Sequence, residues 1–160
     1  MIKYVGLFFD KKETNLIKSL ETNNLGNQND LLHCTFKYRP DDNGFFDEIM
    51  GKTFEIYLIG YGNDGNNSGF EVSLPKELVK YYINYDEEKT DVLKVPHITV
   101  SLSKDAKGVN TKNLKFVPLE KSVKVMGTFG CWVKENNQEF LSFEPLDKFK
   151  DIYVDIESYK

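Results

Sequence analysis

The stretch LLHCTFKY, residues 31–38, contains one of only two histidines in the chain. The other lies in VPHITVSL, residues 95–102, and each histidine is followed two positions later by threonine. Both stretches are short apolar runs with β-branched and aromatic residues, which predicts two strands. This repeat decides the predicted fold, because it indicates two similar halves, each with a strand and a helix before its histidine strand, in an α+β arrangement.

Side-chain alternation along a strand divides each stretch into a polar and an apolar face. The polar face of the first strand is predicted to carry His33, Thr35 and Lys37. The polar face of the second is predicted to carry His97, Thr99 and Ser101. The apolar side chains, which we expect to pack on the core, are Cys34, Phe36, Tyr38, Ile98, Val100 and Leu102.

Two histidines and two threonines suit the cleavage of a phosphodiester. Imidazole has an unperturbed pKa of about 6.5, so one histidine can take a proton from the nucleophile while the other gives one to the leaving oxygen. A threonine hydroxyl on the same face can donate a hydrogen bond to a non-bridging phosphate oxygen. We therefore interpret four residues as catalytic, in a reaction that needs no metal or other cofactor: His33, Thr35, His97 and Thr99.

The same residues allow other interpretations. A lone histidine on a half-buried strand is commonly a structural polar residue, and only the pair favours function. A zinc site would need Cys34 beside His33, but these adjacent side chains point to opposite faces, and no C-x-x-C or H-x-x-H spacing occurs. The same reason disfavours Cys34 as a nucleophile. The glycines of residues 60–69 precede a strand-like stretch, where a phosphate-binding loop would need a helix.

The rest of the chain is predicted to contain further strands and two helices. Asp10 and Glu13 form a capping box at the start of the first helix, whose apolar stripe is Leu16, Ile17 and Leu20. The predicted strands cover residues 2–9, 31–38, 53–61, 69–74, 95–102, 121–133, 138–144 and 151–159. The predicted helices cover residues 10–22 and 75–85, with a helical turn at 45–50 and a polar segment at 103–113.

Composition limits the classes of partner. A chain of 160 residues with 40% hydrophobic content predicts one globular domain over residues 1–160. The net charge of −4 gives no basic excess for a long nucleic acid, so a nucleotide partner is expected to be small. Two cysteines in separate apolar stretches favour a reducing compartment, and the first apolar run is too short to span a membrane. We therefore expect a cytoplasmic protein without a membrane partner, with a monomer as the starting expectation.

With both motifs in view, the sequence resembles the 2H phosphoesterase superfamily, the LigT-like phosphodiesterases. That family has two H-x-[TS] motifs flanked by apolar residues, matched here by LLHCTFKY and VPHITVSL. The order of elements over residues 2–102 is similar as well. The resemblance implies a bilobal α+β fold with two antiparallel sheets facing a central cleft and helices outside, and it carries the catalytic roles to His33, Thr35, His97 and Thr99.

The resemblance also implies a class of substrate. Known family activities include opening of 2′,3′-cyclic phosphates, trimming of RNA ends, cleavage of 2′–5′ oligoadenylates and, in some viral members, degradation of cyclic di- or trinucleotide immune messengers. The segment between the motifs is short, and SLSKDAKG, residues 101–108, lacks the arginine of larger bacterial members. The compact chain is more similar to phage anti-CBASS enzymes. A viral immune-evasion hydrolase acting on a cyclic di- or oligonucleotide is the leading hypothesis, located in the host cytoplasm if the protein is viral.

A nucleotide also needs aromatic surfaces for its bases and further polar contacts. Seven side chains are candidates for binding substrate: Tyr4, Phe8, Lys37, Arg39, Tyr61, Ser101 and Trp132. Core packing is the alternative for the aromatic residues. Three other functions stay open at this point: an RNA-processing or 2′–5′ oligoadenylate phosphodiesterase, a nucleotide-binding sponge without turnover, and a structural α+β module.

Overall fold

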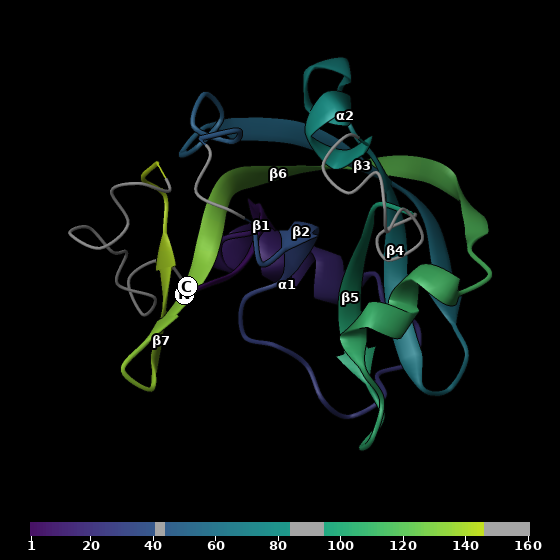
Figure 1. Cartoon of the computed structure of the whole chain (residues 1–160). Coiled ribbons are helices and arrows are strands. Elements are labelled where there is room, and N and C mark those ends of the chain that lie inside the picture. Colours follow the sequence, from purple (N-terminus) through teal and green to yellow (C-terminus); the bar gives the residue numbers. More distant parts are fainter. Residues whose placement is uncertain (41–43, 84–94, 146–160) are drawn as a thin grey trace.

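The structure, a computed structural model, describes residues 1–40, 44–83 and 95–145 (Figure 1). Its strands are β1 (Ile2–Phe8), β2 (His33–Tyr38), β3 (Thr53–Asn63), β4 (Asn67–Ser73), β5 (His97–Leu102), β6 (Val117–Glu135) and β7 (Gln138–Ser142). Its helices are α1 (Lys11–Ser19), α2 (Lys76–Ile83) and the 3-10 helix η1 (Gly108–Asn113). The fold class is α+β, as the sequence predicts.

One antiparallel sheet contains all the described strands, in the order β2-β1-β6-β3-β4-β5, with β7 also paired to β6. The expectation of two separate sheets is wrong for these strands. The reason is the length of β6, whose first part pairs with β3 and whose last part pairs with β1, so that hydrogen bonding runs through both halves. Figure 1 shows β6 arching over β1 and β2.

The two ends of this strand order meet, because the sheet curves into a nearly closed barrel. Strands β2 and β5 lie at opposite ends of the order, yet they contact each other (Figure 1). The backbone N–H of His97 donates a hydrogen bond to the thiol of Cys34, which joins the two strands. The curvature therefore brings the two histidine strands together across 64 positions of sequence, from His33 to His97.

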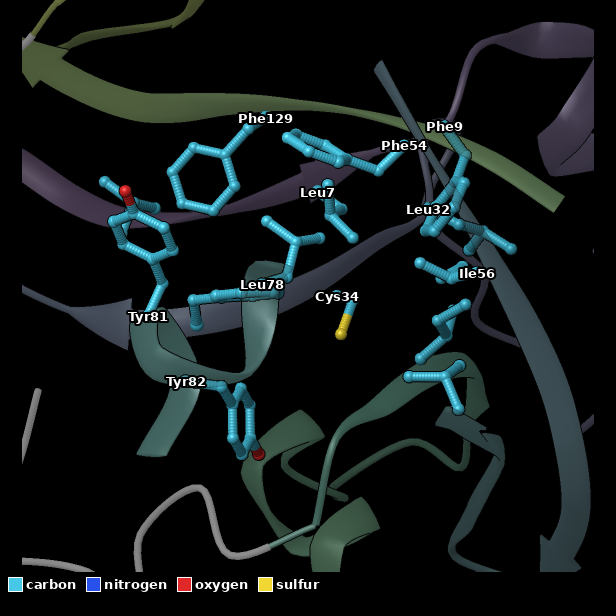
Figure 2. Packing of buried hydrophobic residues seen from close by; sticks show 14 of the residues in the cluster. Leu7, Phe9, Leu32, Cys34, Phe54, Ile56, Leu78, Tyr81, Tyr82 and Phe129 are labelled. Carbon is cyan, nitrogen blue, oxygen red and sulfur yellow. The ribbon is translucent and has the colours of Figure 1, made fainter. Parts of the chain in front are cut away.

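The main core fills the inside of the curved sheet. Figure 2 shows the Cys34 sulfur pointing among these side chains, with Leu78 and Tyr82 of α2 close by. Phe36 and Ile98 belong to the same cluster, so the apolar faces of both histidine strands lie in this core. Burial of such side chains contributes on the order of 1.5–3 kcal/mol each. The core consequently fixes which face of each strand is left for the site.

Helix α1 begins at the predicted cap and ends early. The Asp10 carboxylate accepts a hydrogen bond from the Glu13 N–H at 2.9 Å, as a capping residue does. Ile17 is buried, but Leu16 is 39% exposed, so its predicted place in the apolar stripe is wrong. Thr14 is buried in its stead, because positions 14 and 17 lie on one face of this short helix.

The remaining elements follow the sequence prediction closely. The hairpin β3–β4 is confirmed, as are the second helix and the strand at residues 138–142. Strand β6 is longer than predicted, and the polar segment before it contains η1. The predicted strand at 151–159 and the last two positions of the predicted helix at 75–85 lie outside the described residues. Within the described part of the chain, no helix is long and apolar enough to cross a membrane.

Candidate active site

The first histidine lies on an aromatic face of β1 and β2. The register pairs His33 with Phe8, and directly opposed residues of antiparallel strands share a face. The imidazole stacks on Tyr4, with ring centroids 4.7 Å apart, and lies 5.7 Å from the ring of Phe8. Trp132 extends this surface, because it pairs with Tyr4 across β1 and β6 and stacks at an interplanar angle of 14°.

A β-bulge in β2 changes the faces that simple alternation predicts. Val5 pairs with Lys37 whereas Gly6 pairs with Thr35, which leaves Phe36 as the additional residue. After the bulge, Tyr38 pairs with Tyr4, contacts its ring edge-on and is hydrogen-bonded to Thr35. The prediction that Tyr38 packs in the core is therefore wrong, and it lies on the histidine face, 40% exposed. Lys37 lies on the other face instead, because it is the cross-strand partner of buried Val5.

The second histidine lies on β5, on the face opposite Ile98 and Val100. His97 is 7% exposed, and its Nδ1 is 2.6 Å from the carbonyl oxygen of Val95. A carbonyl can only accept, so Nδ1 carries the hydrogen and Nε2 keeps its lone pair. His33 also has a hydrogen bond to the backbone of Leu31. Each imidazole is thus oriented by the backbone two residues before it.

Burial keeps both imidazoles neutral near pH 7. Burial, and to a smaller extent the charge of His97, lower the pKa of His33 to about 4, against the hydrogen bond to the Leu31 backbone, which raises it. Burial also lowers the pKa of His97, and the ammonium of Lys112 adds to this effect. Such paired and perturbed titratable groups are frequent at functional sites. The site can therefore accept a proton at His33 at neutral pH.

Cys34 does not take part in this chemistry. Its side chain is fully buried in the core, and burial raises the pKa of the thiol to about 12. A neutral buried thiol is neither a nucleophile nor a zinc ligand, and it points away from the imidazole of His33. Within residues 1–40, 44–83 and 95–145, no group of three or more histidine, cysteine, aspartate or glutamate side chains is placed to hold a metal ion.

A cavity of about 360 Å³ adjoins His33. Its floor is aromatic, and Glu139 on β7 lies at its edge, where its Oε1 accepts hydrogen bonds from Trp132 Nε1 at 3.1 Å and Lys3 Nζ at 3.0 Å. Both bonds lower the pKa of this carboxyl, and the bond from Lys3 has the larger effect. The lining residues are Tyr4, Phe8, Asn29, Asp30, Leu31, His33, Trp132 and Glu139.

Four predicted substrate-binding residues are not brought to this cavity. Ser101 is fully buried, where it donates to Glu21 and accepts from the Leu25 N–H at 3.0 Å, so it anchors the segment after α1. The Tyr61 hydroxyl is 2.7 Å from Ser68 Oγ, within the β3–β4 hairpin. Arg39 follows β2 at a φ of 49° and is exposed. The fourth is Lys37, which the bulge displaces.

Several residues near the site could not be singled out from sequence. Thr111 and Lys112 come from η1, the polar segment that gave no strand or helix signal. Thr111 Oγ1 lies 2.7 Å from Thr99 Oγ1. Asn29 and Asp30, which line the cavity, directly precede the first motif. Their position beside this motif is the one sequence feature that could have predicted them.

The lowered histidine pKa values predict that the folded state becomes less stable as the pH is lowered. Between pH 6.5 and about 4 the unfolded chain binds a proton at His33 that the folded chain does not bind, so stability is lost as pH falls through this window. We expect the free energy of unfolding of wild type to decrease by on the order of 2 kcal/mol more than that of His33→Gln. This is less than the whole pKa shift corresponds to, because the ring of His33 is partly solvated. Urea unfolding at pH 7 and pH 4.5 measures this, and equal losses in both proteins would contradict it.

Comparison of the chain with protein-family models and with curated proteins finds no match.

Proposed function

We propose that this protein is a metal-independent phosphodiesterase of the 2H type that hydrolyses a small nucleotide. The observation that carries the proposal is the contact between β2 and β5, together with the effect of the charge of His97 on the pKa of His33. Two strands at opposite ends of the sheet have no local reason to carry the same motif, whereas acid–base cleavage of a phosphodiester needs both. Binding alone does not require two titrating groups, which argues against a sponge or a purely structural module.

We assign the base role to His33 and the acid role to His97. His33, with a pKa of about 4, is unprotonated at neutral pH and ready to take the proton of a ribose 2′-hydroxyl or a water. His97 then gives a proton from Nε2 to the departing 5′-oxygen. It does so from the protonated form of the ring, which is the minor form at neutral pH because burial lowers the pKa of His97. Thr35 and Thr99 hold the non-bridging oxygens of the phosphate, and Lys112, whose charge acts on His97, adds positive potential there.

The aromatic cavity supports a nucleotide as the substrate. Tyr4 and Trp132 are half-buried rings stacked beside His33, and a base that lies on such a ring gains roughly 1–3 kcal/mol. Phe8 is buried and lines the cavity. The cavity has the volume of a small-molecule site, which favours a cyclic di- or oligonucleotide, or another short nucleotide, over a long polymer.

The fold and the location belong to the same proposal. We relate the two halves of the curved sheet to the two facing lobes of 2H phosphoesterases, with β1 and β2 in one half and β3, β4 and β5 in the other. Both cysteines are free and buried, which accords with a reducing cytoplasm, that of the host cell if the protein is viral. Degradation of an immune messenger is the role we favour there.

A substrate panel tests the proposal. Wild type is incubated with cyclic dinucleotides, cyclic trinucleotides, 2′–5′ oligoadenylate and RNA ending in a 2′,3′-cyclic phosphate, and the products are separated by chromatography. We expect turnover of a cyclic nucleotide. Preference for either of the last two substrates would move the assignment to the corresponding enzyme class. Tight binding without product would instead establish a sponge.

Loss of the stacking surface is expected to weaken substrate binding. Trp132→Ala removes one ring of the aromatic face but leaves both histidines in place, so KM is expected to rise about tenfold with a small change in kcat. Phe45→Ala is a matched control, since Phe45 is an exposed aromatic residue that packs on Tyr81 near α2. An unchanged KM in Trp132→Ala would show that the base binds elsewhere.

A further inference from the structure

The hydroxyl of Thr99 has two partners on the segment that includes η1. Its Oγ1 donates to the carbonyl oxygen of Gly108 at 3.2 Å and lies 2.7 Å from Thr111 Oγ1. A threonine hydroxyl has a single hydrogen, so Thr99 can donate to one of these partners at a time. If Thr99 donates to Gly108, the hydrogen between the two threonines must come from Thr111.

Asn67 fixes the direction of this hydrogen-bond chain. Its side chain is 2% exposed, and its Nδ2 donates to the Lys107 carbonyl at 2.8 Å and to Thr111 Oγ1 at 3.1 Å. Thr111 is fully buried and accepts from Asn67, which leaves its own hydrogen for Thr99. One assignment satisfies all of these contacts: Asn67 donates to Thr111, Thr111 to Thr99, and Thr99 to Gly108.

The sheet is built to let Thr111 approach. Gly69 on β4 pairs with Thr99, and a Cβ at Gly69 would lie 2.6 Å from Thr111 Cγ2 and 2.5 Å from the Ile98 carbonyl oxygen. Any larger residue at position 69 would displace Thr111. The contact between the two threonines is therefore part of how β4, β5 and η1 pack together, and its hydrogen-bond direction is fixed by buried groups.

We propose that Thr111, held by Asn67, is a positioning residue that directs the hydroxyl hydrogen of Thr99 toward the phosphate. This inference rests on the proposed phosphodiesterase function. When substrate binds, Thr99 exchanges its 3.2 Å bond to Gly108 for a bond to a non-bridging oxygen, while it continues to accept from Thr111. A hydroxyl that accepts a hydrogen bond is a better donor, so this chain strengthens the phosphate contact. The Thr35 hydroxyl contacts Tyr38 instead, so the two motifs are supported differently.

A double-mutant cycle tests this role in the full-length protein, with a substrate identified by the panel. Thr111→Val removes the hydroxyl at nearly constant volume and is expected to lower kcat about tenfold, with KM changed less than twofold. Thr111→Ser is expected to restore kcat. In a Thr99→Val background, Thr111→Val is expected to lower kcat by less than about a further twofold, because Thr111 acts through Thr99. Thr53→Val is the matched control, since Thr53 forms a similar pair with Thr128 on the β3–β6 surface.

Three outcomes would overturn the inference: kcat of Thr111→Val within twofold of wild type, no rescue by serine, or losses that multiply in the double mutant. If Thr111→Val does not fold, as judged by circular dichroism, Thr111→Ala takes its place with the same expectations. Histidine variants that lose activity while Thr111→Val keeps it would defeat only the positioning role. A wild type without turnover on any substrate would defeat the proposed function, and this inference with it.

Discussion

His33→Ala and His97→Ala are each expected to lower kcat/KM at least about a hundredfold, the scale of general acid–base catalysis. The reason is that each imidazole moves a different proton, so neither can take over the role of the other. Both variants are expected to keep the wild-type fold, because His33 is half-buried and the Nδ1 of His97 bonds to a backbone carbonyl. Steady-state rates, with circular dichroism as the folding control, measure this effect.

The leaving group distinguishes the two roles. On the 4-nitrophenyl ester of uridine 3′-phosphate the departing oxygen needs no proton, so His97→Ala is expected to come within about tenfold of wild type. His33→Ala is expected to stay inactive on the same substrate, because the 2′-hydroxyl still needs a base. The reverse pattern would exchange the two roles. Full activity of either variant on the natural substrate would end the two-histidine proposal.

Acidic conditions should favour the wild-type reaction. The pKa of His97 is lowered by burial and by Lys112, so its protonated form is already the minor one at neutral pH and becomes scarcer still as the pH rises. A kcat/KM that falls from pH 6 to pH 8 is therefore part of the same expectation.

Gly6→Ala is expected to destabilise the fold by about 3 kcal/mol or more. A Cβ at Gly6 would lie 2.1 Å from the Cys34 carbonyl oxygen and 3.0 Å from Thr35 Cα. Both obstacles are backbone of the first motif, so β2 must shift or detach. Urea unfolding followed by tryptophan fluorescence measures the free energy of unfolding.

Gly108→Ala is the control for this substitution. The nearest atom to a Cβ at Gly108 is Thr99 Oγ1 at 3.8 Å, an ordinary contact, so the change in stability is expected to stay within about 0.5 kcal/mol. Wild-type stability in Gly6→Ala would contradict the close pairing of β1 and β2 beside the bulge, and with it the placement of Thr35.

The sequence predicted the local features of this fold well. The strands around both motifs, the Asp10 cap and the β3–β4 hairpin all follow from patterns within a few residues. The core faces of Cys34 and Ile98 also follow, because alternation holds as long as the strand is regular. These features depend on short-range stereochemistry and on burial, both of which a single sequence records.

What the sequence did not predict depends on contacts between distant segments. The bulge at Phe36 is set by the register with β1, and it exchanges the faces of Lys37 and Tyr38. A second bulge, at Val100, moves Ser101 off the face of Thr99, and Ser101 donates to Glu21, 80 positions earlier. Thr111 joins the site through a packing arrangement that involves three elements. A one-residue change in register reverses side-chain faces, so residues after a bulge are the hardest to place.

The most direct test of the account is the turnover of a cyclic dinucleotide by wild type, His33→Ala and His97→Ala, each measured with and without EDTA. The account predicts that wild type forms a linear or mononucleotide product at the same rate in EDTA, and that both variants form at least about a hundredfold less. Turnover that survives in either histidine variant, or that EDTA abolishes in wild type, would contradict a single metal-independent site built from β2 and β5.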